Sequence, residues 1–206
     1  MSGFIYVVAR DYGFAPNPFS GFCTLATCKP GVREHAQIGD WIIGVGSIEK
    51  CQKNKLVYLM QVTRKITYNE YWTNPSYSDK KPVMNGSLKQ MYGDNIYYLD
   101  EETNQWTQAD SHHSYKGGIT NEINLRTDTS SKFVLISNNF YYFGKDAIEI
   151  PKDFREEIYW SGRKYKKVRD LDCLDSFIRW VEKNFQKGYH SGPLLFESFK
   201  RYDGRS

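Results

Sequence analysis

Short apolar runs separated by turn-forming residues are the feature that most limits the fold of this chain. Four stand out, at residues 4–9 (FIYVVA), 41–46 (WIIGVG), 56–63 (LVYLMQVT) and 132–136 (KFVLI). Each is short and rich in β-branched or aromatic residues, which favours strands. A run that is apolar on both faces is typical of a strand covered on both sides. The sequence therefore predicts a β-rich domain with buried central strands.

Helices are predicted around these strands. Apolar residues keep helical spacing from Leu171 to Phe185, which predicts an amphipathic C-terminal helix. Residues 83–131 are polar and interrupted by glycines, so we interpret them as a long insertion, functional or mobile. We expect a single domain over residues 1–206, with a basic segment and the C-terminal helix in residues 163–206.

The basic residues are not evenly distributed. The formal net charge is +4, and the excess of basic over acidic side chains falls within residues 151–206. Such a patch either attracts phosphate backbones or is simply a solvated face. The candidate nucleic-acid contacts are the densest run, Arg163, Lys164, Lys166, Lys167 and Arg169.

Neither a membrane span nor a secretory leader is recognisable in the sequence, so we expect a cytoplasmic protein with no membrane partner. The four cysteines contain no Cys-x-x-Cys pair, and Cys23 and Cys28 have no second pair at matching spacing. Structural zinc prefers such pairs. We therefore expect reduced thiols, no metal and no cofactor.

The segment after the first apolar run has an unusual composition. Residues 12–21 (YGFAPNPFSG) combine two prolines and two glycines with three aromatic rings. Proline and glycine favour a shaped, irregular loop. Aromatic rings are unexpected in a surface loop. Either the loop folds back and closes the end of the domain, or its rings stack on a ligand.

The sequence contains no complete catalytic motif. We therefore expect a binding module rather than an enzyme. Histidine is the usual acid–base group near neutral pH, so His112 and His113, with Asp110 as a carboxylate, are the alternative catalytic residues. A cysteine nucleophile, Cys23 or Cys28 with a histidine, is a further possibility without a local signature.

The stretch from Tyr6 to Ser47 carries three distinctive pieces, ARDYGFAPNPF, CTLATCKP and GDWIIGVGS. With them the chain resembles the second nucleotide-modification-associated domain family, and the likeness extends through Phe140 to Gly144. More loosely, it is similar to PUA-like barrels, especially EVE and YTH domains, in which an aromatic pocket takes a modified base. The resemblance implies an α+β fold, with a mixed, mostly antiparallel PUA-like β-barrel and peripheral helices.

Loop composition and resemblance together predict a module that binds a nucleotide or a modified base, associated with nucleic-acid modification or phage defence. One alternative is an enzyme, a hydrolase or transferase, acting on such a base. Another is a protein-interaction module in which the basic segment and helix of residues 163–206 dock a partner. Aromatic rings stack on bases, amides and hydroxyls read base edges, and cations bind phosphate. The predicted stacking residues are Tyr12, Phe14, Phe19 and Trp72. The predicted contacts to the base edge are Asn17, Thr27 and Ser47, and those to phosphate are Arg10, Lys29 and Arg33.

Overall fold

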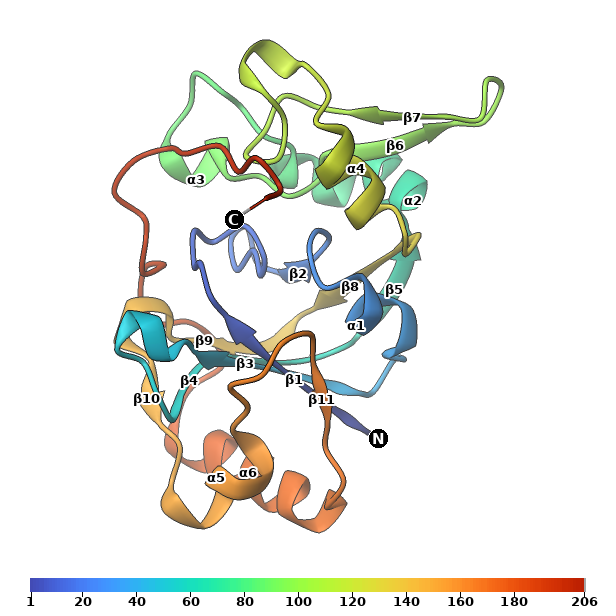
Figure 1. Cartoon of the computed structure of the whole chain (residues 1–206). Helices are drawn as coiled ribbons and strands as arrows, with labels where there is room; N and C mark the ends of the chain where they lie inside the picture. The colour runs from blue at the N-terminus through green and yellow to red at the C-terminus, as the bar shows by residue number, and fades with distance from the viewer. Residues whose placement is uncertain (206) are drawn as a thin grey trace.

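The computed structural model describes residues 1–205, which form a mixed α+β fold with three sheets (Figure 1). The largest sheet has the order β11-β1-β3-β4-β9-β12, and β10 pairs with β4. Its strands are β1 (Gly3–Val8), β3 (Trp41–Gly46), β4 (Lys55–Gln61), β9 (Asn139–Tyr142), β10 (Ile148–Glu149), β11 (Lys166–Lys167) and β12 (Gly188–Tyr189).

The central strands of this sheet arise from the apolar runs of the sequence. β1 pairs in parallel with β3, and β3 pairs antiparallel with β4. Successive side chains of a strand point to opposite faces. Accordingly Phe4 and Tyr6 join the core on one face, whereas Ile5 joins the core on the other. Both faces are covered, which explains why these runs are apolar throughout.

Two smaller sheets and several short helices lie on one side of the large sheet (Figure 1). The three-stranded sheet has the order β2-β8-β5, and β6 and β7 form a hairpin. The elements of this side are β2 (Cys23–Leu25), α1 (Pro30–His35), β5 (Arg64–Thr67), α2 (Tyr68–Thr73), α3 (Leu88–Met91), β6 (Tyr97–Asp100), β7 (Gln105–Gln108), α4 (Glu122–Asp128) and β8 (Phe133–Ser137).

The other side of the large sheet is covered by α5 (Arg155–Ile158) and α6 (Leu171–Asn184). Leu174, Phe177, Ile178 and Val181 of α6 are buried against it. After α6 and β12 the chain returns past α3 to the opposite side of the molecule, as the red trace in Figure 1 shows. Short 3₁₀ turns connect these elements at residues 48–50, 75–80, 116–118, 144–146 and 152–154.

A closed barrel, which the likeness to PUA-like domains implies, is not formed by residues 1–205. The large sheet stays open, because its path ends at the two-residue strands β11 and β12. The strands β2, β5 and β8 pair among themselves instead of closing it. The coarser α+β expectation holds. No helix in the described residues is long and apolar enough to cross a membrane.

The segment at 83–131 contributes to the core of the molecule. It contains α3, the β6–β7 hairpin and α4. Tyr92, Ile96 and Tyr97 from this segment are buried, and they pack with Phe14 of residues 12–21, the aromatic loop. The loop and the polar segment therefore meet in one place, and that place is the candidate site.

Candidate functional site

Cys28 occupies a tight turn between β2 and α1. Its φ is 56° and that of Lys29 is 41°, so two consecutive side-chain-bearing residues are left-handed. This conformation costs on the order of 1–2 kcal/mol per residue and persists where the surroundings enforce it. Pro30 then begins α1. The turn leaves Cys28 partly exposed, beside a cavity.

The buried side chain of Arg33 fixes that turn from inside. Its Nε donates to the carbonyl of Cys28 at 2.9 Å, and one terminal nitrogen donates to the carbonyl of Asp128 at 2.6 Å. The other terminal nitrogen donates to the carbonyls of Ser131 and Phe133, at 3.1 and 2.7 Å. Arg33 is fully buried, so these four bonds tie the Cys28 turn to the end of α4 and the start of β8.

Asp128, the last residue of α4, is also buried. One carboxylate oxygen accepts the Cys28 amide at 2.7 Å, and the other accepts the Tyr97 hydroxyl at 2.9 Å and His113 Nδ1 at 2.8 Å. Burial alone would raise the pKa of Asp128. The charge of His113 and the hydrogen bonds outweigh burial, and the pKa lies below its ordinary value. The group is therefore a carboxylate near neutral pH.

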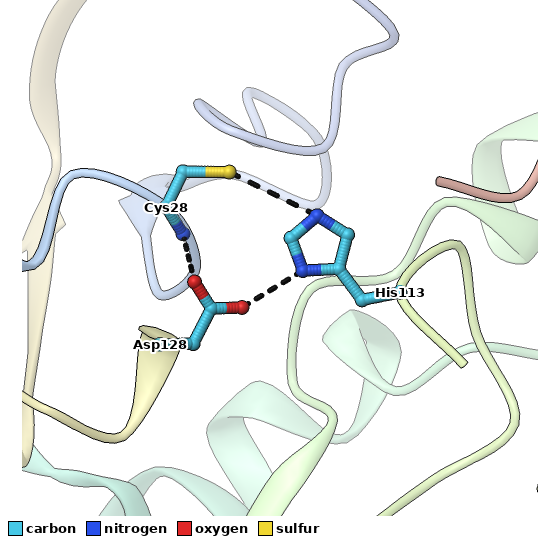
Figure 2. Close-up of side chains that lie close together, drawn as sticks. All are labelled: Cys28, His113 and Asp128. Atoms are coloured by element: carbon cyan, nitrogen blue, oxygen red, sulfur yellow. Dashed lines mark hydrogen bonds and ion pairs between the residues drawn. The ribbon is translucent and has the colours of Figure 1, made fainter. Parts of the chain in front are cut away.

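His113 lies between this carboxylate and the thiol (Figure 2). Its Nδ1 faces Asp128, and its Nε2 lies 3.8 Å from the Sγ of Cys28. Burial opposes protonation of the ring, but the neighbouring Asp128 and Cys28 outweigh it and raise the pKa of His113 to about 10. The ring is thus an imidazolium near neutral pH. The order of contacts, from the Cys28 sulfur to the His113 ring to the Asp128 carboxylate, matches that of a cysteine nucleophile with its histidine and acid.

The same three side chains are also within range of a shared metal ion, since their ligand atoms lie within 4.8 Å of one another. Their orientation does not suit one. Cys28 and Asp128 face different nitrogens of the His113 ring. Because Nδ1 is engaged with Asp128, only Nε2 of the ring is open to an ion shared with the Cys28 sulfur.

The trio lies at the inner end of a cavity of about 760 Å³. Its outer residues Arg10, Glu49, Lys50 and Arg163 are exposed, whereas His113 and Asp128 are buried. Aromatic rings form much of the remaining wall, contributed by Tyr6, Tyr12, Phe14 and Tyr202. With Lys29 included, the wall carries four basic side chains of Lys and Arg. Glu49 is its only carboxylate besides the neutralised Asp128.

The C-terminal segment completes this wall. The Tyr202 amide donates to the carbonyl of His112 at 2.7 Å, and Asn124 donates to the Tyr202 carbonyl at 2.8 Å. The guanidinium of Arg10 lies over the Tyr202 ring, 4.9 Å from its centre. His112 contacts the Lys200 carbonyl through its ring Nδ1. Burial and the charge of His113 lower the pKa of His112 to about 3, so this ring is neutral.

Several residues predicted from the sequence meet in this cavity. Arg10, Tyr12, Phe14 and Lys29 line it, together with His112 and His113. Asp110 instead pairs with Arg201, at 2.6 Å. Of the basic run, Arg163 lines the cavity. Lys164 and Arg169 are exposed, Lys166 pairs with Glu157, and Lys167 lies over the Phe4 ring.

The other predicted ligand residues lie elsewhere. Asn17 is buried and bonded to buried Lys80, whose Nζ donates to the Asn17 side chain at 2.8 Å. Ser47 and Thr27 are buried outside the cavity lining, as is Arg33 in its carbonyl clamp. Trp72 stacks on Tyr98 with ring centres 4.6 Å apart. Phe19 lines a second cavity.

Asp128 was not among the residues predicted from the sequence. It ends a short helix within the polar segment, and no motif distinguishes it from the acidic residues around it. From the sequence, Cys28 was one of two possible cysteine nucleophiles, and no local signature separated it from Cys23.

The profile of a family described as nucleotide modification associated domain 2 matches residues 1–200 of the chain. No curated protein and no solved structure is significantly similar to it. The matched range includes Cys28, His113 and Asp128, and it ends just before Tyr202 of the cavity wall.

Proposed function

Because the chain belongs to the nucleotide modification associated domain 2 family, we propose that its cavity binds a nucleotide or a modified base and that Cys28 attacks it. One observation carries the proposal. The Cys28 thiol faces a buried imidazolium–carboxylate pair at the inner end of a cavity large enough for a small ligand.

The cavity wall suits a ligand that is both flat and anionic. The Tyr12 ring lines the cavity and is partly exposed, and an exposed ring stacks on any base. Phe14 also lines the cavity, but its ring is buried against His112 and His113. Lys29 and Arg163 add positive charge to the wall, where Glu49 is the one carboxylate that could compensate it. This excess of positive charge favours a phosphate group on the ligand. These contacts support the predicted nucleotide or modified-base ligand.

Catalysis rather than binding alone is favoured by the buried charges. Burying an ion pair is costly, and strongly shifted pKa values cluster at functional sites. A binding module could stack and pair with a base without a charged His113 facing a thiol. The Nε2 of this ring lies 3.8 Å from the Cys28 sulfur, close to where a group leaving during attack would need a proton.

The reaction class that fits is acyl transfer at a carbonyl group carried by the ligand. The Cys28 thiolate adds to the carbonyl carbon, the bond from that carbon to its nitrogen or oxygen leaving group breaks, and His113 donates its Nε2 proton to that group. A thioester remains. The neutral His113 then takes a proton from water, whose oxygen attacks the thioester carbon. The C–S bond breaks, a carboxylic acid leaves, and the thiolate and imidazolium are restored.

Site-resolved alkylation tests the nucleophile. Brief exposure to iodoacetamide at neutral pH is expected to label Cys28 faster than Cys51, although Cys51 is the more exposed thiol. His113→Asn should slow labelling of Cys28 to the rate of Cys51. His35→Asn, at an exposed histidine on the surface, is the matched control and should change nothing. Equal labelling of Cys28 and Cys51 in the parent would contradict an activated thiol.

A second experiment tests the chemistry. The parent is incubated with nucleotides whose bases carry ester or amide groups, and products and protein mass are followed. Turnover or a protein adduct that is lost in Cys28→Ala, while nucleotide binding persists, supports the proposal. Nucleotide binding with no turnover and no adduct for any of these compounds would leave the binding module as the function.

A further inference from the structure

A second cavity, of about 580 Å³, lies on another part of the surface. It is formed by the end of the aromatic loop at residues 18–21, by Lys89 of α3, by the turn at Asn138, and by the chain around β12. Nothing in the reaction described above uses it. None of the residues of the Cys28 cavity wall lines it.

Aromatic rings make up the apolar part of this cavity. Phe19 lies 5.7 Å from Tyr189 and 5.6 Å from Phe196, measured between ring centres. Tyr189 is 47% exposed although it stacks on Tyr142 at 5.7 Å, with the two planes within 7°. An aromatic ring that is supported from behind and open to solvent is a ready platform for another flat group.

The charged part of the cavity has a single sign. Lys89 and Lys187 are both exposed, and they are the only charged residues that line it, with no carboxylate among the lining. The Nζ of Lys89 lies 5.4 Å from the centre of the Phe19 ring. A flat apolar platform flanked by cations is the arrangement with which proteins hold single-stranded nucleic acid, by base stacking and phosphate contact.

A continuous row of rings joins the two cavities. Tyr12 of the Cys28 cavity stacks on Tyr92 at 5.3 Å, and Tyr92 contacts Phe196 at 5.9 Å. Phe196 and Phe19 belong to the second cavity. Tyr92 is buried, so this row runs through the core, and it places the two cavities only a few ring-to-ring steps apart.

We propose that the second cavity holds a neighbouring nucleotide of a single strand whose modified base enters the Cys28 cavity. The substrate is then a base within a single-stranded nucleic acid rather than a free nucleotide. This inference rests on the proposed function for the role of the Cys28 cavity. The binding of a strand by Phe19, Tyr189 and the two lysines does not depend on that role.

Fluorescence anisotropy with labelled single-stranded oligonucleotides, of DNA in one arm and RNA in the other, tests the site. The parent should bind at least one of them, and more weakly as salt rises. Lys89→Glu with Lys187→Glu should weaken binding by about tenfold or more. The matched control is Lys53→Glu with Lys152→Glu, two exposed lysines outside both cavities, which should stay within about twofold of the parent. Tyr189→Ala should weaken binding while Tyr189→Phe preserves it, because only the ring is needed.

Three results would overturn the inference: no binding of either oligonucleotide by the parent, parent-like binding by the Lys89 and Lys187 variant, or equally tight binding of a polyglutamate peptide. The two proposals fail separately. If Cys28 reacts rapidly and free nucleotides turn over but no strand binds, the second site is wrong and the proposed function stands. If a strand binds through Lys89 and Lys187 but Cys28 labels like Cys51, the proposed function is wrong and the second site stands.

Discussion

The carboxylate of Asp128 accepts a hydrogen bond from the backbone amide of Cys28 at 2.7 Å. Its other oxygen holds the His113 ring at 2.8 Å. One buried group therefore sets both the position of the proposed nucleophile and the charge of its partner. In a Ser-His-Asp triad the acid orients the histidine and stabilises its charged form. Here it also fixes the left-handed turn that carries the sulfur, so its loss should affect geometry and electrostatics together.

Asp128→Asn is therefore expected to lower the rate of Cys28 alkylation by on the order of a hundredfold at neutral pH. The neutral amide no longer stabilises the imidazolium, so the thiol loses its cationic partner. Mass spectrometry of the labelled peptide measures the rate. Asp175→Asn, which removes an exposed carboxylate paired with Arg179, is the control. An unchanged rate in a folded Asp128→Asn protein would show that His113 needs no carboxylate.

The stability contributed by His113 should depend on pH in a defined direction. The pKa of the folded protein's His113 is raised from 6.5 to about 10, so its stabilising effect is complete below about pH 6.5 and is lost as pH rises toward 10. The pKa of Asp128 is lowered instead, so the stability that this carboxylate contributes is present above pH 3.8, the ordinary pKa of the group, and is lost as pH falls below it.

Urea unfolding of the parent and of His113→Asn between pH 5 and pH 10 measures this effect. We expect the variant to be less stable by on the order of 3 kcal/mol at the acidic end. The difference should shrink as pH increases. A difference that stays constant over this range would mean that the ring is not charged in the folded protein.

Arg33→Met is expected to destabilise the protein by on the order of 3 kcal/mol, because four carbonyl groups lose their buried donor. The alkylation rate of Cys28 should fall in the molecules that remain folded, since the turn is no longer held. Arg126→Met, at an exposed arginine of α4, should leave both quantities unchanged. A variant as stable as the parent would contradict the structural role of Arg33.

Tyr12→Ala should weaken the binding of nucleoside monophosphates, or of their modified forms, by about tenfold through the loss of a stacking surface. Arg10→Ala should weaken the binding of phosphorylated ligands more than that of nucleosides. Trp72→Ala is the matched aromatic control, because Trp72 lies outside the cavity against Tyr98. Isothermal titration measures each affinity. Equal losses for Tyr12→Ala and Trp72→Ala would argue against the cavity as the binding site.

The large sheet could be predicted from sequence because its central strands are buried on both faces. FIYVVA and WIIGVG became β1 and β3. The register, the parallel pairing of β1 with β3 and the open ends of the sheet are set by contacts between distant segments, and local patterns do not contain them. For the same reason the closed barrel was a wrong expectation.

The candidate site was predictable in part. Arg10, Tyr12 and Phe14 were singled out because rings and cations in a proline-rich loop are unusual, and they do line the cavity. Asn17 came from the same reasoning, but its side-chain oxygen accepts from the Phe19 amide within the loop and from Lys80. In sequence, an amide that shapes a turn cannot be told from one that reads a base. Asp128 lies 100 residues from Cys28 and carries no motif. Only the folded chain brings the two together.

That long separation has a consequence for how the protein is made. During synthesis Cys28 emerges well before His113 and Asp128, which follow 85 and 100 residues later. Until they arrive, the sulfur is an ordinary cysteine with no cation beside it and no enforced turn. A polypeptide that is still shorter than this on the ribosome therefore does not carry the proposed nucleophile in its site. The arrangement of Cys28, His113 and Asp128 forms only after the chain through Asp128 has been made and has folded.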